Sequence, residues 1–130
     1  MYQQTCYQQN IMIVKDDSAL INNVQELLKN NGFEVIIANN CRKCLFELEK
    51  GFHGIIIIDL KTSIFNGIEI IRKIRDEGFI NQNIILMLTP KCILGEEFEE
   101  IYPYIHDLIF KPLDVHILLK TIKKITHRSH

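Results

Sequence analysis

Asp59 is the clearest candidate for chemistry in this chain, because of the residues that precede it. Residues 54–67 read GIIIIDLKTSIFNG, so four isoleucines run directly into a carboxylate. An unbroken run of branched aliphatic residues is typical of a strand covered on both faces, as in a parallel sheet. Because an unpaired buried carboxylate is costly, we expect Asp59 at the mouth of that strand, where a cation or a ligand reaches it.

Polar residues also end the other apolar runs of strand length. In each case the polar group stands at the terminus, and the apolar stretch itself carries no charge. These groups are Lys15, Asp16 and Asp17 after residues 11–14, Thr89 at the end of residues 83–89, and Lys111 with Pro112 after residues 108–110. The carboxyl ends of parallel strands share one edge of a sheet, where ligands bind in such folds. We therefore expect the three acids Asp16, Asp17 and Asp59, a hydroxyl and Lys111 to converge there.

Helical patterns separate these strands along the chain. The predicted helices span residues 18–31, 41–50, 68–78, 96–102 and 114–125, and a further strand is predicted at 34–38. Asn31-Gly32 and Gly78 are typical helix stops, and Asp114 is a typical N-cap. Five rounds of strand and helix predict an α/β fold, a doubly wound three-layer sandwich with a five-stranded parallel sheet and five helices.

The chemistry that fits these groups is phosphoryl transfer to a carboxylate. Asp59 would act as the nucleophile and form an acyl phosphate. A Mg²⁺ ion held by oxygen ligands would relieve the repulsion between clustered carboxylates. Lys111 would balance charge on the phosphoryl oxygens, and Thr89 would donate a hydrogen bond to one of them.

These residues resemble the response-regulator receiver domain of two-component signalling, over residues 10 to 126. Asp59 matches the phosphoacceptor of that family, and Gly67 follows eight residues later, where the family keeps a glycine. Thr89 matches the switch hydroxyl, and Lys111-Pro112 matches the Lys-Pro pair, which is a cis peptide in the family. The resemblance implies a flavodoxin-like fold with strand order 2-1-3-4-5.

The resemblance also implies a metal site and partners. Mg²⁺ would be held by Asp16, Asp59 and the backbone carbonyl of Lys61, with Asp17 as a further candidate ligand. A histidine kinase or a phosphotransfer protein would donate the phosphoryl group, and phosphorylation would switch partner binding. The domain would support only its own phosphorylation and dephosphorylation, so it is not expected to be an enzyme. A homodimer would form through the face of the fourth helix, fifth strand and fifth helix.

Several positions depart from the family pattern. Lys15 stands where the acidic cluster usually begins, Pro90 replaces a small residue, and Leu108 replaces the switch aromatic. The loop after Asp59 carries Thr62-Ser63 in place of a Met-Pro pair. Lys15 is expected to weaken Mg²⁺ binding, either by repelling the ion or by pairing with Asp59 and imitating it. These changes leave an alternative open, a pseudo-receiver that binds partners but is not phosphorylated because of Lys15 and Pro90.

Two other functions are less well supported by the residues. Haloacid dehalogenases also phosphorylate a strand-end aspartate, but they need a second acid where this chain has Lys61. Cys41 and Cys44 form a CRKC motif at the start of a helix, the position of a thioredoxin-like redox pair. Cys44 falls on the core face of that helix, so we predict a small buried hydrophobe there. Cys6 and Cys92 lack zinc-ligand spacing.

The composition limits the remaining possibilities. A chain of 130 residues with a net charge of −1 fits one domain and argues against a surface that binds nucleic acid electrostatically. No secretory signal or membrane span is evident, so a cytoplasmic location is expected. The expected organisation is a loosely ordered tail at 1–10, the receiver domain at 11–126 and a C-terminal tail at 127–130. Either a stand-alone receiver without an effector domain or a fragment of a longer regulator is expected.

Overall fold

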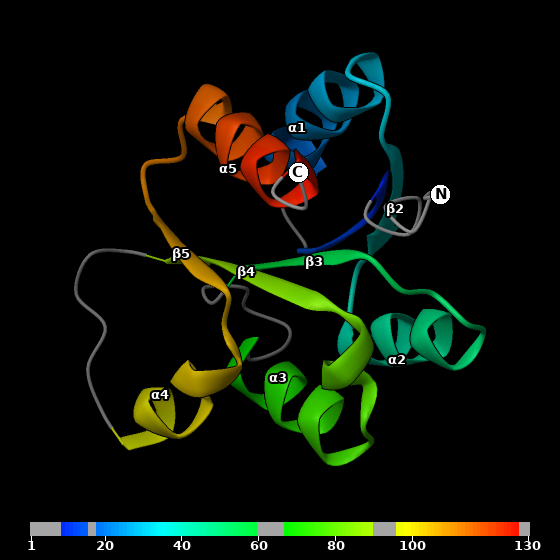
Figure 1. The fold of residues 1–130 in the computed structure, drawn as a ribbon, viewed down its shortest axis with the longest axis vertical. Coiled ribbons are helices and arrows are strands. Elements are labelled where there is room, and N and C mark those ends of the chain that lie inside the picture. Colours follow the sequence, from blue (N-terminus) through cyan, green and yellow to red (C-terminus); the bar gives the residue numbers. More distant parts are fainter. Residues whose placement is uncertain (1–8, 16–17, 60–66, 90–95, 128–130) are drawn as a thin grey trace.

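Five parallel strands form a single sheet in the order β2-β1-β3-β4-β5 (Figure 1). The computed structural model describes residues 9–15, 18–59, 67–89 and 96–127. The strands are β1 (Asn10–Val14), β2 (Glu34–Ala38), β3 (Ile55–Asp59), β4 (Ile84–Thr89) and β5 (Asp107–Phe110). This order and the parallel pairing confirm the predicted flavodoxin-like fold class.

Five α-helices cover the two faces of this sheet among the described residues. They are α1 (Ser18–Asn30), α2 (Cys41–Glu49), α3 (Gly67–Asp76), α4 (Glu96–Ile101) and α5 (Val115–His127). In Figure 1, α1 and α5 lie above the sheet, and α2, α3 and α4 lie below it. Two short 3₁₀ helices, η2 (Phe79–Gln82) and η3 (Tyr102–Tyr104), precede β4 and β5. The sandwich therefore has the three predicted layers.

The central strand β3 explains the isoleucine run in the sequence. Ile55, Ile56, Ile57 and Ile58 are all buried, because β3 pairs with β1 on one side and β4 on the other. Alternate residues point to opposite faces, as expected for a strand. Ile55 and Ile57 join the core beneath α1 and α5, whereas Ile56 and Ile58 join the core against α2 and α3. A strand with apolar residues at every position thus serves two cores.

The ends of the helices follow their sequence signals. Gly32 and Gly78 have φ values of 92° and 84°, the left-handed conformation that glycine adopts most easily, after α1 and α3. Asp114 caps α5 as predicted, because its Oδ1 accepts a hydrogen bond from the backbone N–H of His116 at 2.9 Å. β1 includes Asn10 and α5 runs to His127, one residue beyond each limit expected for the domain.

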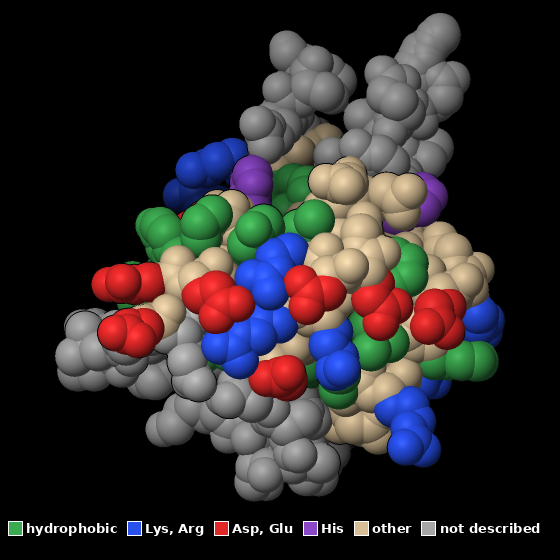
Figure 2. All heavy atoms as spheres, turned by 90° about the horizontal axis from the view of Figure 1, so that it is seen from below, with side chains coloured by type: hydrophobic (Ala, Val, Ile, Leu, Met, Phe, Trp, Pro, Cys, Tyr) green, Lys and Arg blue, Asp and Glu red, His purple; other side chains and the backbone are tan. Residues whose placement is uncertain are grey.

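A network of exposed ion pairs joins α4 to α3. The carboxylate of Glu100 accepts hydrogen bonds from Arg72 Nη2 and Arg75 Nη1, each at 2.9 Å. Figure 2 views the side of the molecule on which α3 and α4 lie, and acidic and basic side chains are interleaved there. Glu100 belongs to the acidic run EEFEE of α4 and is exposed, and it also ties this short helix to the neighbouring one.

The described helices include none with both the length and the apolar character that crossing a membrane requires.

Candidate functional site

Asp59 ends the central strand, and its carboxylate is almost completely buried, with 1% of the side chain exposed. The register of the sheet sets its neighbour on β1. Val14 pairs with Ile58, so Lys15 follows directly beside Asp59 on the adjacent strand. The ammonium of Lys15 donates a hydrogen bond to Asp59 Oδ2 and forms a salt bridge with it. Lys15 is buried as well, with 8% of its side chain exposed.

Lys111 approaches the same carboxylate from the other side. Its Nζ donates to Asp59 Oδ1 at 2.7 Å. Lys111 follows β5, and β4 lies between β5 and β3. The backbones of β3 and β5 are therefore two strand spacings apart, about 10 Å, and the long side chain of Lys111 spans most of the distance to Asp59. The backbone N–H of Lys111 donates to the carbonyl of Thr89 at 2.7 Å, and the Lys111–Pro112 peptide bond is cis.

The alternation of side chains along the strands explains why these groups meet. Asp59 continues the set of Ile55 and Ile57, which point toward α1 and α5. Lys15 stands two residues after Ile13, and Lys111 two residues after Ile109, and both isoleucines belong to the same core. A period of two therefore brings all three charged groups to one face at one edge of the sheet.

Thr89 ends β4 at this same edge and is fully buried. It lies one residue beyond Leu88, which pairs with Asp59 across β3 and β4. The strand thus delivers a hydroxyl residue to the position expected from the sequence. Its role as a switch hydroxyl remains a prediction.

Lys15 and Lys111 each form a hydrogen-bonded ion pair with Asp59. A buried ion pair is stabilising only where its geometry is good and its remaining polar atoms are hydrogen-bonded. Each carboxylate oxygen of Asp59 accepts from a different ammonium group, which meets this condition. With their ordinary charges, Lys15, Asp59 and Lys111 together carry one net positive charge.

The described residues do not fit a Mg²⁺ ion at Asp59 Oδ2, because an ammonium group already contacts that oxygen. Among the residues that the structure describes, no group of three or more acidic, histidine or cysteine side chains is placed to hold a metal. The other predicted ligands, Asp16, Asp17 and the carbonyl of Lys61, lie outside the described residues. Of the two effects expected for Lys15, pairing with Asp59 is the one observed.

The CRKC motif contributes to the packing of the core rather than to a redox site. Cys44 is fully buried in the core between the sheet and α2, and both Cys41 and Cys44 are free thiols. Burial raises the pKa of Cys44 to about 12, and burial also raises the pKa of Cys41. The burial of Cys44 confirms the prediction of a small buried residue at this position. The raised thiol pKa values argue against a reactive redox pair, which needs a lowered thiol pKa.

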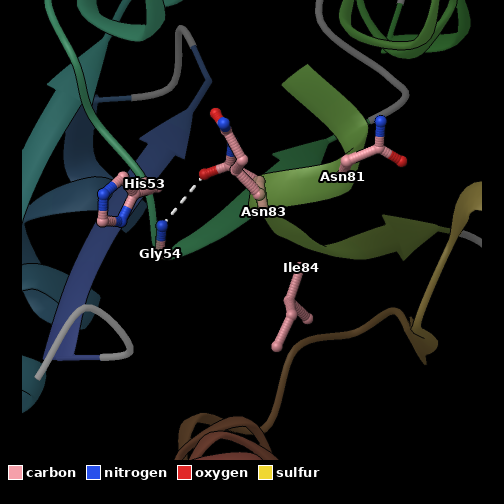
Figure 3. Close-up of a pocket in the computed structure, with 6 residues that line it drawn as sticks. His53, Gly54, Asn81, Asn83 and Ile84 are labelled. Atoms are coloured by element: carbon pink, nitrogen blue, oxygen red, sulfur yellow. Dashed lines mark hydrogen bonds between the residues drawn. The ribbon is translucent and has the colours of Figure 1, made fainter. Parts of the chain in front are cut away.

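A pocket that sequence reasoning did not single out lies at the opposite end of the strands (Figure 3). It has a volume of about 350 Å³ and is lined by residues preceding β3 and at the start of β4, including His53 and Asn83. Asn83 Oδ1 accepts a hydrogen bond from the backbone N–H of Gly54 at 2.9 Å, and its Nδ2 donates to the carbonyl of Phe79. Asn83 thus has a structural role, joining the starts of two strands, and the pocket is remote from Asp59.

Comparison with known proteins decides the family. The model of the response regulator receiver domain matches residues 11–123. This chain is a response regulator receiver domain. Receivers are signalling domains of two-component systems and do not form a class of conventional enzymes.

Relatives agree with this assignment. The probable transcriptional regulator ycf29 of Porphyra purpurea is 28% identical over 120 residues, which cover 92% of this chain and 57% of the relative. A CheY-like receiver from Methanospirillum hungatei JF-1 superposes with a TM-score of 0.83 at 29% identity, over 93% of this receiver and 98% of that chain. The receiver spans 53% to 57% of the length of three of the curated relatives it matches, and 27% of the length of another, the transcriptional regulatory protein ZraR of Escherichia coli (strain K12).

A more distant structure shares the fold alone. It is a chain from the co-crystal structure of the Saccharomyces cerevisiae phosphotransfer protein Ypd1 with the receiver domain of Ssk1. The TM-score is 0.75 at 23% identity, over 88% of this receiver and 86% of that chain.

The departures from the family pattern have different outcomes in this receiver. Lys15 contacts Asp59, as described above. Leu108, at the position of the switch aromatic, is half-buried against the core on the α3 side of the sheet. Pro90 and the Thr62-Ser63 pair lie outside the described residues.

Proposed function

We propose that this receiver accepts a phosphoryl group on Asp59 and thereby changes the surface that a partner reads. The observation that carries the proposal is the contact of 2.7 Å between Lys111 Nζ and Asp59 Oδ1 at the mouth of the central strand. A carboxylate at this edge is the nucleophile, and a lysine beside it supplies positive charge for the phosphoryl oxygens.

The transfer is a simple displacement. An oxygen of Asp59 forms a bond to phosphorus, and the bond from phosphorus to the histidine nitrogen of the donor breaks. The leaving nitrogen keeps the electron pair of that bond and takes up a proton from solvent, which gives a neutral imidazole. Phosphoryl transfer needs positioning and charge more than covalent help from the protein, and Lys111 and the hydroxyl of Thr89 are proposed to supply them. The acyl phosphate is later hydrolysed, so Asp59 is regenerated.

Receiver domains generally bind Mg²⁺ at an acidic pocket. By the family pattern, the oxygen donors in this chain would be Asp16, Asp59 and the backbone carbonyl of Lys61, with Asp17 as a further donor. Lys15 competes with such an ion for Asp59, because its ammonium contacts Oδ2.

The donor is proposed to be a histidine kinase or a phosphotransfer protein. The receiver domain of Ssk1 has the phosphotransfer protein Ypd1 as such a partner in their co-crystal structure. We further propose a cytoplasmic location and a receiver domain at residues 11–126. The proposed tails are 1–10 and 127–130, whose innermost residues, Asn10 and His127, belong to β1 and α5.

A second copy of the chain is proposed to pair through α4, β5 and α5. Phe110 of β5 and Ile117 of α5 are large apolar side chains that are about half exposed, at 50% and 54%. Tyr102, which follows α4, is similarly exposed at 55%. Apolar side chains on neighbouring elements give such a face the character of a protein interface.

The test is phosphorylation by acetyl phosphate, followed by intact-protein mass spectrometry. We expect one phosphoryl adduct on the wild type and none on Asp59→Ala. Asp76→Ala, which removes an exposed acid at the end of α3, is the matched control and should retain the adduct. Circular dichroism of each variant separates loss of the acceptor from loss of the fold.

A pseudo-receiver is the second candidate, and one observation favours it. Lys15 and Lys111 together engage both oxygens of Asp59, so an incoming phosphorus must displace one contact. A wild type that stays unmodified with and without Mg²⁺, and that does not respond to beryllofluoride, would establish this candidate and contradict phosphorylation of Asp59.

A further inference from the structure

The ammonium of Lys15 stands at an unusual place for a receiver. It contacts Asp59 Oδ2 at the carboxyl edge of the sheet, where an oxygen-ligated cation was expected from the sequence. Both side chains are buried, at 8% and 1% exposure, so little solvent screens the pair.

We propose that Lys15 is a built-in cation that excludes Mg²⁺ from Asp59, so that phosphoryl acceptance on Asp59 proceeds without the metal. The second half of this inference rests on the proposed function. The first half concerns metal binding alone and is tested independently.

The backbone holds Lys15 in this place. Its N–H donates to the carbonyl of Ala38 at 3.2 Å, which extends the pairing of β1 with β2 by one residue. On the other side, the register of β1 with β3 brings Lys15 beside Asp59. The ammonium is therefore positioned by two neighbouring strands rather than by a loop, and it is part of the resting site.

Among the three charged side chains that the structure describes at this site, the balance of charge favours phosphorylation without a metal. In the resting site, two ammonium groups face one carboxylate, which leaves one net positive charge on these three side chains. Conversion of the carboxylate to a dianionic acyl phosphate makes the sum zero. A Mg²⁺ ion added to the resting trio raises its charge to plus three and places a divalent cation against an ammonium group, which is unfavourable in a buried site.

An ammonium can also replace the hydrogen-bonding role of a cation. It carries three N–H donors and a compact charge, so one donor can hold a carboxylate oxygen while another contacts a phosphoryl oxygen. During transfer the new bond forms between Asp59 and phosphorus, and the leaving group departs with the electron pair of the broken bond. Lys15 and Lys111 remain protonated throughout, so no further reactant is needed.

The first experiment measures Mg²⁺ binding directly, by isothermal titration calorimetry of the unphosphorylated protein. Lys15→Asp removes the ammonium and adds a carboxylate, and it should bind Mg²⁺ at least about tenfold more tightly than the wild type, a difference of about 1.4 kcal/mol. Lys123→Asp makes the same change of charge on the exposed surface of α5 and should bind like the wild type. Lys15→Met, which preserves the length of the side chain, is the second variant should Lys15→Asp not fold, and it should also bind more tightly.

The second experiment follows acetyl phosphate labelling with Mg²⁺ and with EDTA. The wild type should label at rates that agree within about twofold in the two conditions. Lys15→Asp should label only with Mg²⁺, because its site has lost a cation.

The outcomes separate the two proposals. A wild type that binds Mg²⁺ as tightly as Lys15→Asp, or that loses labelling in EDTA, overturns the role of Lys15 while leaving Asp59 as the acceptor. Absence of an adduct from every protein in every condition overturns the proposed function together with metal-free transfer, and the titration then decides the exclusion of Mg²⁺ by itself.

Discussion

At the scale of single residues, the site depends on one buried carboxylate shared by two lysines. The two lysines differ in exposure, because Lys15 is enclosed by strands whereas the side chain of Lys111 is 23% exposed. Loss of one member of a buried pair is damaging mainly because its partner stays behind uncompensated. The loss of stability caused by a substitution in this site should therefore depend on which charged group remains, and on how exposed that group is to water.

Unequal effects on stability are expected from Asp59→Ala and Lys111→Met. Asp59→Ala leaves the ammonium of Lys15 buried without its carboxylate and should lower the free energy of unfolding by about 3 kcal/mol. Lys111→Met leaves Asp59 paired with Lys15 and should cost about 1 kcal/mol. Urea denaturation monitored by circular dichroism gives both values. Equal losses for the two variants would contradict the arrangement described for Lys15.

At the scale of elements, α4 is the shortest of the described α-helices. It has six residues, its Ile101 is fully buried, and its Phe98 packs against the same core. Its remaining attachment includes the ion pairs of Glu100 with Arg72 and Arg75 on α3. Hydrogen bonds from Arg72, and then from Arg75, hold the pKa of Glu100 below its usual value. This network makes the docking of α4 sensitive to acid.

The sign of the pH dependence follows from the lowered pKa of Glu100. Its contribution is complete above the pKa that it has in the unfolded chain and is lost as the pH falls through the lower folded value. Because the charges are exposed, the effect is modest and weakens with salt. The hydrogen-exchange protection factors of residues 96–101, which correct for the intrinsic pH dependence of exchange, should fall roughly two- to fivefold in Glu100→Gln at neutral pH. The same fall should occur in the wild type under acid.

Glu99→Gln is the matched control, since it removes the neighbouring exposed charge of α4. Its exchange should match that of the wild type at neutral pH. Equal exchange in Glu100→Gln and Glu99→Gln would show that the network does not hold α4.

At the scale of the whole molecule, the sequence predicted the architecture well because its signals are strong and repeated. The run from Ile55 to Ile58 predicts a strand buried on both faces, and the structure has it at the centre of the sheet. The observed elements differ from the predicted ones where the sequence signal is weak. Neither η2 nor η3 was predicted, because short 3₁₀ turns have no hydrophobic period of their own.

The candidate site was predicted in part. The convergence of Asp59 and Lys111 follows from strand ends that share one edge, and the structure confirms their contact. The contact of Lys15 with Asp59 was one of two possibilities, since the choice depends on strand register and on side-chain direction, which residue types alone do not fix. The network at Glu100 requires α3 and α4 to be side by side, and no local pattern within α4 indicates this.

The most direct test of the account is to identify the residue that carries the phosphoryl group. The wild type is labelled with acetyl phosphate, the acyl phosphate is reduced with borohydride, and the peptides are mapped by mass spectrometry. We expect the reduced side chain at position 59 and no reduced peptide from Asp59→Ala. Reduction at another acid, or at none in a folded and labelled wild type, would contradict it.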